Sequence, residues 1–301
     1  MIPDMQNDDL TARASVLTIF ICILFGANPV AIKFCLTGIG SFTAAGIRFT
    51  IAAVVIFIWA RLKKTPLKLN QKQLGQMLIV SSIFVVQLSC FYLGLSKTTA
   101  SHGALISNVL PFFVLVLAHF FIPGDSISLK KGLGVTLGFV GVLFLFFDEQ
   151  DLSGDLKRGD LIVLIAVMLW SSSGIFVKRI ISEYNVVQIT IYPMIFGVPF
   201  FFIGGFLWDD QMIRFINPAI IKSVLYQSII TASFGFIAWN SLLQKFGATA
   251  LHSFIFIMPL AGVLFGVLLL GETITPHLII SIIFIVTGVI IVNFRRKGKE
   301  I

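Results

Sequence analysis

The stretch ASHGALISNVLPFFV, residues 100–114, returns 148 positions later as ATALHSFIFIMPLAG, residues 248–262. Within this match Pro111 falls on Pro259, and an alanine opens both copies. Similarity at a constant offset is the sequence signature of an internal repeat. The sequence therefore predicts that the chain contains two copies of one structural unit.

Two further pairs of segments extend the repeat along the chain. Their second members follow the first by 147 and 145 positions, close to the offset above. The pairs are GDSIS from Gly124 with GETIT from Gly271, and LFGANPVAIK from Leu24 with LWSSSGIFVK from Leu169. We expect each copy to occupy about half of the chain.

The composition indicates a membrane protein. Of the 301 residues, 57% are hydrophobic and 12% are charged, whereas an average soluble domain is about 25% charged. Residues 1–10 are polar and acidic, unlike the basic start of a cleaved signal peptide, so we expect the first apolar segment to be retained. The three cysteines are odd in number and predict no disulfide framework.

Apolar runs of membrane-spanning length predict ten helices, because a helix needs about 20 mainly apolar residues to cross the hydrocarbon core. An odd number of spans in each copy makes the second copy enter the membrane from the opposite face. The predicted fold is therefore an all-α integral membrane protein with ten transmembrane helices in two inverted five-helix repeats. The predicted spans are 14–36, 42–60, 74–95, 103–122, 131–147, 161–177, 187–208, 220–243, 251–270 and 278–294.

The charges predict the topology. The net charge of +8 comes from lysines and arginines at the ends of apolar segments, so we expect no nucleic-acid partner. Most of them lie in connections on the side of the N-terminus, which predicts a multi-pass protein of the cell (cytoplasmic) membrane with both termini in the cytoplasm. The predicted parts are an N-terminal tail 1–13, a first repeat 14–147, a linker loop 148–160 with solvated acids, a second repeat 161–294 and a basic tail 295–301.

This arrangement resembles the EamA family of the drug/metabolite transporter superfamily. The resemblance rests on FGAN from Phe25, on ALISNVLPFFV from Ala104 with GD after it, and on FIFIMPLAG from Phe254 followed by GE. It implies that helices one to four and six to nine surround a central cavity, with helices five and ten outside. Gly134 and Gly138 on the fifth helix permit close helix contact; we expect internal packing there, with a homodimer contact as the alternative.

The resemblance implies a secondary transporter that exports a small metabolite, such as an amino acid or related compound. Inverted repeats predict alternating access, with substrate near the midplane. The alternatives are an uptake permease or exchanger for an anionic metabolite, and a membrane ligand sensor without transport. HExxH and GxSxG motifs are missing from the sequence, so we expect no enzyme, no metal and no cofactor. The expected partners are a small-molecule substrate and the lipid bilayer, for a monomer or homodimer.

Polar side chains within the predicted spans are the candidate substrate contacts, because a polar group that faces lipid lacks a partner. For the asparagines and serines the alternative is hydrogen bonding between helices without a ligand. The candidates are Asn28, Arg48, Gln87, Tyr92, Asn108, Ser171, Ser173, Tyr192, Trp239 and Asn240.

Arg48 lies about seven residues into the second span, roughly 10 Å from its outer end. As a binding residue it favours an anionic or carboxylate substrate, and as an interfacial residue it reaches toward the membrane surface. Lys33 and Lys178 occupy equivalent positions in the two copies, where we expect interfacial anchors.

Three prolines, Pro29, Pro111 and Pro259, are predicted helix breaks. Pro29 lacks the N–H that would bond the carbonyl of Phe25, close to the midplane. FGANPVAIKF, residues 25–34, is therefore a predicted wall of the substrate cavity. A kink that only shapes packing is the alternative.

Acidic residues are expected only in tails, loops and helix ends, which argues against a multidrug cation pump. Asp125 and Glu272 follow helix-ending glycines, and we expect them to cap a helix or pair with a loop group. Histidine is a residue type suited to proton coupling; this is one interpretation of His102, His119 and His252, with interfacial or packed positions as the alternative.

Overall fold

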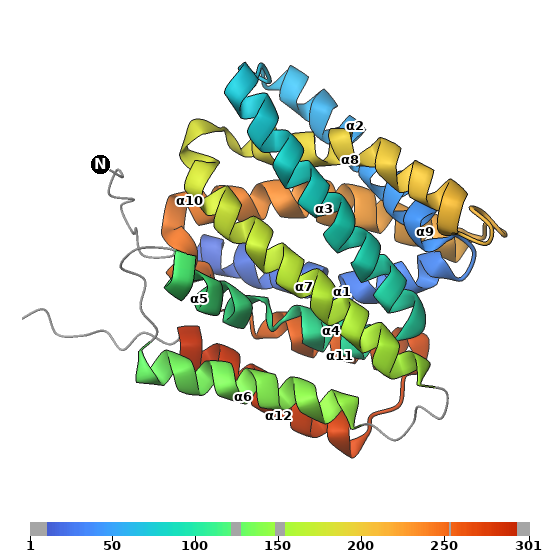
Figure 1. The fold of residues 1–301 in the computed structure, drawn as a ribbon, viewed down its shortest axis with the longest axis vertical. Coiled ribbons are helices and arrows are strands. Elements are labelled where there is room, and N and C mark those ends of the chain that lie inside the picture. Colours follow the sequence, from blue (N-terminus) through green and yellow to red (C-terminus); the bar gives the residue numbers. More distant parts are fainter. Residues whose placement is uncertain (1–10, 122–127, 148–153, 253, 294–301) are drawn as a thin grey trace, which may run out of the picture.

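The computed structural model describes residues 11–121, 128–147, 154–252 and 254–293. This part of the chain is almost entirely helical (Figure 1). The helices are α1 Ala12–Leu36, α2 Ser41–Leu62, α3 Gln71–Lys97, α4 Ala100–Ser107, α5 Leu110–Phe121, α6 Leu129–Phe146, α7 Asp155–Ile180, η1 Ile181–Glu183, α8 Val186–Trp208, α9 Pro218–Leu225, η2 Tyr226–Gly235, α10 Phe236–His252, α11 Ile257–Leu270 and α12 Pro276–Asn293.

The predicted fold class is confirmed. Eight helical stretches of the described chain are long and apolar enough to cross a membrane, and two shorter apolar helices complete ten. The fourth span consists of α4 and α5, and the eighth consists of α9, η2 and α10. We call the end of the bundle where α1 starts the terminal end, and the end where it stops at Leu36 the opposite end; they lie left and right in Figure 1.

The helix pairs show the repeat in space. α2 packs against α8, and α6 packs against α12, its counterpart in the other copy. The third span, α3, packs against α7, and its counterpart, formed by α9, η2 and α10, packs against α1, the counterpart of α7. In the same way α1 packs against α11, and α7 packs against α4 and α5, which form the counterpart of α11. The same pairings therefore recur when the two halves are exchanged.

Helices α6 and α12 lie together along one side of the bundle (Figure 1), where the resemblance places the fifth and tenth helices. A Cβ atom added to Gly288 of α12 would lie 2.6 Å from the carbonyl oxygen of Gly134 and 3.0 Å from the nitrogen of Gly138. The two glycines of α6 thus serve contact within the chain, as expected.

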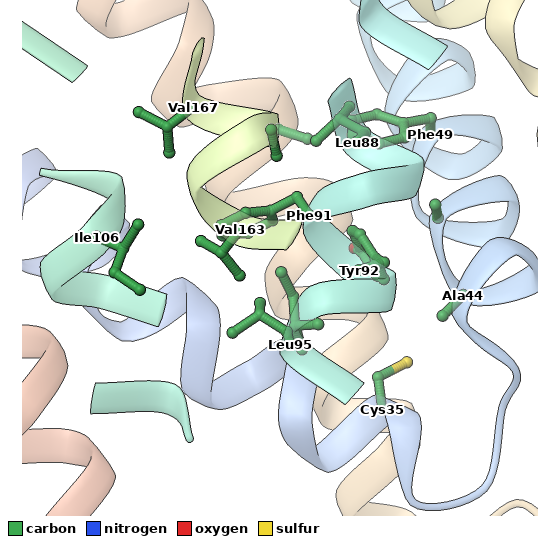
Figure 2. Close-up of a cluster of buried hydrophobic side chains, with 14 of the residues drawn as sticks. Cys35, Ala44, Phe49, Leu88, Phe91, Tyr92, Leu95, Ile106, Val163 and Val167 are labelled. Atoms are coloured by element: carbon green, nitrogen blue, oxygen red, sulfur yellow. The ribbon is translucent and has the colours of Figure 1, made fainter. Parts of the chain in front are cut away.

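Helix α3 lies within the largest hydrophobic core cluster. Figure 2 shows Phe91 and Leu95 directed toward Val163 of α7. Tyr92, on the next position, points instead to the side of α2 and Ala44 (Figure 2). All five side chains are buried, so α3 joins α7 to α2.

The predicted linker loop 148–160 is wrong for its last residues, because α7 begins at Asp155. Gly154, with a φ of 76°, precedes the first turn. The charged residues within 155–160 favoured a loop. However, α7 has 26 residues and is about 39 Å long, so it extends beyond the roughly 30 Å hydrocarbon core. Charged residues are tolerated in that extension.

Pro29 does not break a helix, and this prediction is corrected. α1 is continuous from Ala12 to Leu36 with Pro29 buried inside it. Side chains of the eighth span bond the flanking carbonyls: the Tyr226 hydroxyl donates to Leu24 O over 2.6 Å, and Gln227 Nε2 donates to Ala31 O over 3.0 Å. The eighth span thus supplies hydrogen-bond donors to α1 on both sides of Pro29.

The other two prolines follow interruptions of the helix. Asn108 and Val109 lie between α4 and α5, and Pro111 is the second residue of α5. Pro259 is the third residue of α11. Proline is tolerated in a first helical turn because its missing N–H has no partner there in any case.

We expect Gly288→Ala to lower the unfolding midpoint in detergent, because its Cβ would meet backbone atoms of α6 that cannot rotate away. Overpacking of this kind costs about 1–3 kcal/mol. Gly75→Ala is the matched control, since a Cβ there meets nothing within 4 Å. Equal midpoints for both variants in thermal scanning would contradict the close α6–α12 contact.

Candidate functional site

A group of polar side chains lies inside the bundle between α1, α2, α3 and η2. We call Asn28, Arg48, Tyr92, Gln227 and Thr231 the polar cluster. Arg48 is only 4% exposed, and its guanidinium donates to the Tyr92 hydroxyl and to Thr231 Oγ1, each over 3.3 Å. Three helices of the first repeat and one helical segment of the second thus meet at one charge.

The remaining bonds of the polar cluster hold its acceptors in place. The Tyr92 hydroxyl donates to Gln227 Oε1 over 2.7 Å, and Thr231 Oγ1 lies 3.2 Å from Asn28 Oδ1 and 2.8 Å from the carbonyl of Gln227. Tyr92, Gln227 and Thr231 are buried, and Asn28 is half-buried. Each partner of Arg48 therefore has a second hydrogen-bond partner.

The charge of Arg48 is not neutralised by the residues that the structure describes. No ion pair of Arg48 occurs among them, and its Nε has no hydrogen-bond partner. The guanidinium carbon also lies 4.9 Å from the ring centroid of Phe49. A guanidinium stays charged in proteins, and a buried charge is costly unless paired. The polar cluster is therefore suited to receive an anion.

Gln87, another candidate, lies on α3 five residues before Tyr92. Its side chain is buried and its Oε1 has no hydrogen-bond partner. Trp239 lies near Phe25 of α1, with ring centroids 6.1 Å apart.

The other candidates lie elsewhere. Ser173 is buried in α7. The other four donate hydrogen bonds: Asn108 Nδ2 to Ala104 O at the α4–α5 interruption, Ser171 Oγ to Val167 O within α7, the Tyr192 hydroxyl to Leu67 O at the terminal end, and Asn240 Nδ2 to Thr190 Oγ1 of α8.

Gln227 and Thr231 were missed in the sequence analysis. They lie on η2, a π-helix of ten residues that the apolar pattern did not predict. The available signal was the polar series Gln227, Ser228, Thr231 and Ser233 inside an apolar span. All four are buried.

Two cavities lie toward the ends of the bundle. One of about 570 Å³ lies at the opposite end between α1, α2, α3, α7 and α8, and its lining includes Lys33, Ser96, Asp155 and Arg214. One of about 240 Å³ lies between α5 and α7 and is lined by Ser172 and other residues. Neither cavity is lined by a residue of the polar cluster, in which Asn28 is half-buried and the other four side chains are buried.

Side chains close the helix ends at the opposite end. The Asp209 carboxylate accepts from the backbone nitrogens of Phe42 and Thr43 over 3.2 and 2.9 Å, at the start of α2. Glu272 accepts from the nitrogens of Ala100 and Ser101 over 2.6 and 2.9 Å. Carboxylates are favoured at helix N-termini. The capping role expected of Glu272 is confirmed, whereas Asp125 lies outside the described residues.

Lys33, an expected interfacial anchor, contacts the end of a neighbouring helix. Its Nζ donates to Leu95 O over 3.0 Å and to Thr98 O over 2.8 Å. A cation is favoured at the C-terminus of a helix, here that of α3. Lys33 therefore ties α1 to α3.

Asp160 contradicts the expectation of a solvated linker acid. It lies on α7, is fully buried, and accepts a hydrogen bond from Thr98 Oγ1. Its other oxygen lies 2.8 Å from Nδ1 of the buried His102. Of the other two candidate histidines, His119 packs against Phe120, and the side chain of His252 lies outside the described residues.

Known proteins match this chain along most of its length. The model of the "EamA-like transporter family" matches residues 12–147 and 157–294. The "Probable amino-acid metabolite efflux pump" of Escherichia coli (strain K12) is 25% identical over 300 residues, covering 97% of this chain and 98% of that protein. The "Uncharacterized transporter YoaV" of Bacillus subtilis (strain 168) is 22% identical over 285 residues, covering 94% and 97%.

One solved crystal structure has a similar fold, with a TM-score of 0.69 at 14% identity. The match covers 93% of this chain and 96% of that one.

We expect Arg48→Met to leave the unfolding midpoint unchanged or to raise it. Methionine removes a buried charge, and Tyr92 and Thr231 keep their other partners. Replacing even a buried ion pair by apolar groups is often neutral or stabilising by about 1–4 kcal/mol. Arg61→Met, at the exposed end of α2, is the control in thermal scanning. A large loss of stability for Arg48→Met alone would mean that the arginine serves the fold.

Proposed function

Because the chain belongs to the EamA-like transporter family, we propose that it exports a small metabolite carrying a carboxylate, such as an amino acid or a related compound. Family membership makes it a multi-pass membrane transporter and not an enzyme. The substrate class, the direction and the mechanism are our proposal.

The single observation that carries the substrate class is the buried guanidinium of Arg48 without an ion pair among the described residues. A carboxylate has the geometry to accept two parallel N–H bonds from a guanidinium. The hydroxyls of Tyr92 and Thr231 and the amides of Asn28 and Gln227 surround the same point. They can donate to a carboxylate after rearranging, which gives the substrate its polar shell.

Alternating access is supported by the placement of the polar cluster between the two repeats. α1, α2 and α3 come from residues 14–147 and η2 from residues 161–294, so a relative movement of the two repeats changes the cluster. Secondary transporters with inverted repeats bind substrate at such an interface. A single polypeptide chain contains the whole cluster, so a monomer is sufficient for binding.

Two further points support export. The distribution of lysine and arginine favours cytoplasmic termini in the cell membrane, which would place the opposite end outside. A relative from Escherichia coli and one from Salmonella typhimurium are both named "Probable amino-acid metabolite efflux pump". An uptake permease or exchanger would use the same cluster, and a ligand sensor would bind without flux.

The first test compares metabolites retained by cells with and without the protein, by mass spectrometry. We expect carboxylate metabolites to be depleted by the native protein, and Arg48→Met to lower their export about tenfold or more, because hydrogen bonds to a charged group contribute about 1.5–3 kcal/mol. Arg48→Lys should be intermediate, since lysine keeps the charge without the bidentate geometry. Arg61→Met is the control. Undiminished export of an acid by Arg48→Met would refute the proposed site.

The second test measures access to the two cavities by cysteine labelling in proteoliposomes. Ser96→Cys reports on the cavity at the opposite end and Ser172→Cys on the one between α5 and α7, with Cys22, Cys35 and Cys90 replaced by alanine. A metabolite identified in the first test should raise labelling at one position and lower it at the other. A simultaneous rise at both positions would indicate a channel.

A further inference from the structure

A buried carboxylate and a buried imidazole form a pair at the opposite end, separate from the polar cluster. Asp160 of α7 is fully buried and His102 of α4 is 4% exposed, with 2.8 Å between Oδ2 and Nδ1. The second oxygen of Asp160 accepts from the hydroxyl of Thr98, the residue that ends α3. An ionised carboxylate only accepts hydrogen bonds, and here it has a side-chain partner at each oxygen.

A contribution to the stability of the fold does not by itself explain the Asp160–His102 pair. Taking a carboxylate out of water is costly, and a well-packed neutral pair would be as stable or more so. The contact α3–α7 is already close without it, because a Cβ on Gly94 would lie 2.9 Å from the carbonyl of Gly159. An ionisable group inside a membrane bundle is a functional candidate by default.

The pair lies where elements of both repeats are tied together. Lys33 of α1 donates to the carbonyl of Thr98, whose hydroxyl donates to Asp160. Ser101, beside His102, donates from its hydroxyl to Glu272 over 2.5 Å. A change in the charge of Asp160 therefore acts on the junction of α1, α3, α4 and α7 with the segment after α11.

Other charged groups belong to the surrounding elements. Lysines at the start of α6 lie at the terminal end, away from the pair. The charged or titratable groups at or near the opposite end are Lys33 on α1, Lys97 on α3, Asp155, Lys157 and Arg158 on α7, Glu272 after α11 and His277 on α12.

We propose that Asp160 and His102 form a proton-binding site whose occupancy opens the opposite end of the bundle. The inference rests on the proposed function, because it concerns the movement by which that end opens. One proton from the solution at the opposite end binds the pair as that end opens, and the same proton returns there as it closes. We place the proton on the carboxyl group of Asp160, where it turns one acceptor oxygen into a donor, so that the bonds from Thr98 Oγ1 and from Nδ1–H of His102 are no longer both made to acceptors.

Opening is measured by the distance between spin labels on Thr37→Cys and Lys157→Cys, in a background with the native cysteines replaced by alanine. Thr37 is the residue after α1 and Lys157 is the third residue of α7, and both are exposed at the opposite end. We expect longer distances to gain population as pH falls from about 8 to about 5. For one proton the ratio of open to closed changes at most about tenfold per pH unit.

Asp160→Asn mimics the protonated carboxyl, so we expect it to be open at both pH values. His102→Gln keeps a hydrogen-bonding amide and should lose the pH response. His277→Asn is the matched control, a histidine removed at the same end, and it should respond to pH like the native protein. Gel filtration and thermal scanning establish that each variant is folded.

A native protein whose distances do not change with pH would overturn the inference, as would a pH response in Asp160→Asn or in His102→Gln equal to that of the native protein. The measurement needs no substrate, so its failure is distinguishable from failure of the export assay, which tests the proposed function alone.

Discussion

The structure depends on the requirement that every backbone polar group within a bilayer finds a partner inside the protein. Regular helices meet it themselves, and side chains meet it wherever a helix is weakened or ends. Gln227 bonds a carbonyl near Pro29, Asn108 bonds one at the α4–α5 interruption, and Lys33 bonds two at the end of α3. Polar residues inside the spans therefore have a structural role, in bonding backbone carbonyls, that does not depend on a ligand.

This requirement explains which parts of the architecture could be predicted from sequence. Ten spans and their repeat follow from apolar length and from local motifs such as those around Pro111 and Pro259, which need no knowledge of neighbouring helices. The hydrogen bonds on both sides of Pro29 could not be predicted, because their donors, Tyr226 and Gln227, lie about 200 positions away in sequence. The local sequence indicates that hydrogen-bond donors are needed near a proline, but it does not indicate which residues supply them.

The candidate site was predictable to a similar extent. Asn28, Arg48 and Tyr92 are polar residues in apolar spans, and the structure brings them together. Residue type alone did not separate them from Ser171 or Tyr192, which bond backbone carbonyls elsewhere. Asp160 was misplaced for a related reason: a charged stretch beside a glycine is typical of a loop, and only the packing of α7 against α3 shows it to be buried.

The π-helical winding of η2 has a geometric consequence for α1. Gln227 and Phe236 are nine positions apart, and in a regular α-helix that spacing corresponds to roughly 900°, which puts two side chains on opposite faces. Both nevertheless meet α1, Gln227 at the carbonyl of Ala31 and Phe236 at the ring of Phe25, 5.8 Å between centroids. The wider turns absorb the missing half rotation. A single span thereby presents first a polar and then an aromatic face to the same neighbour, without bending around it.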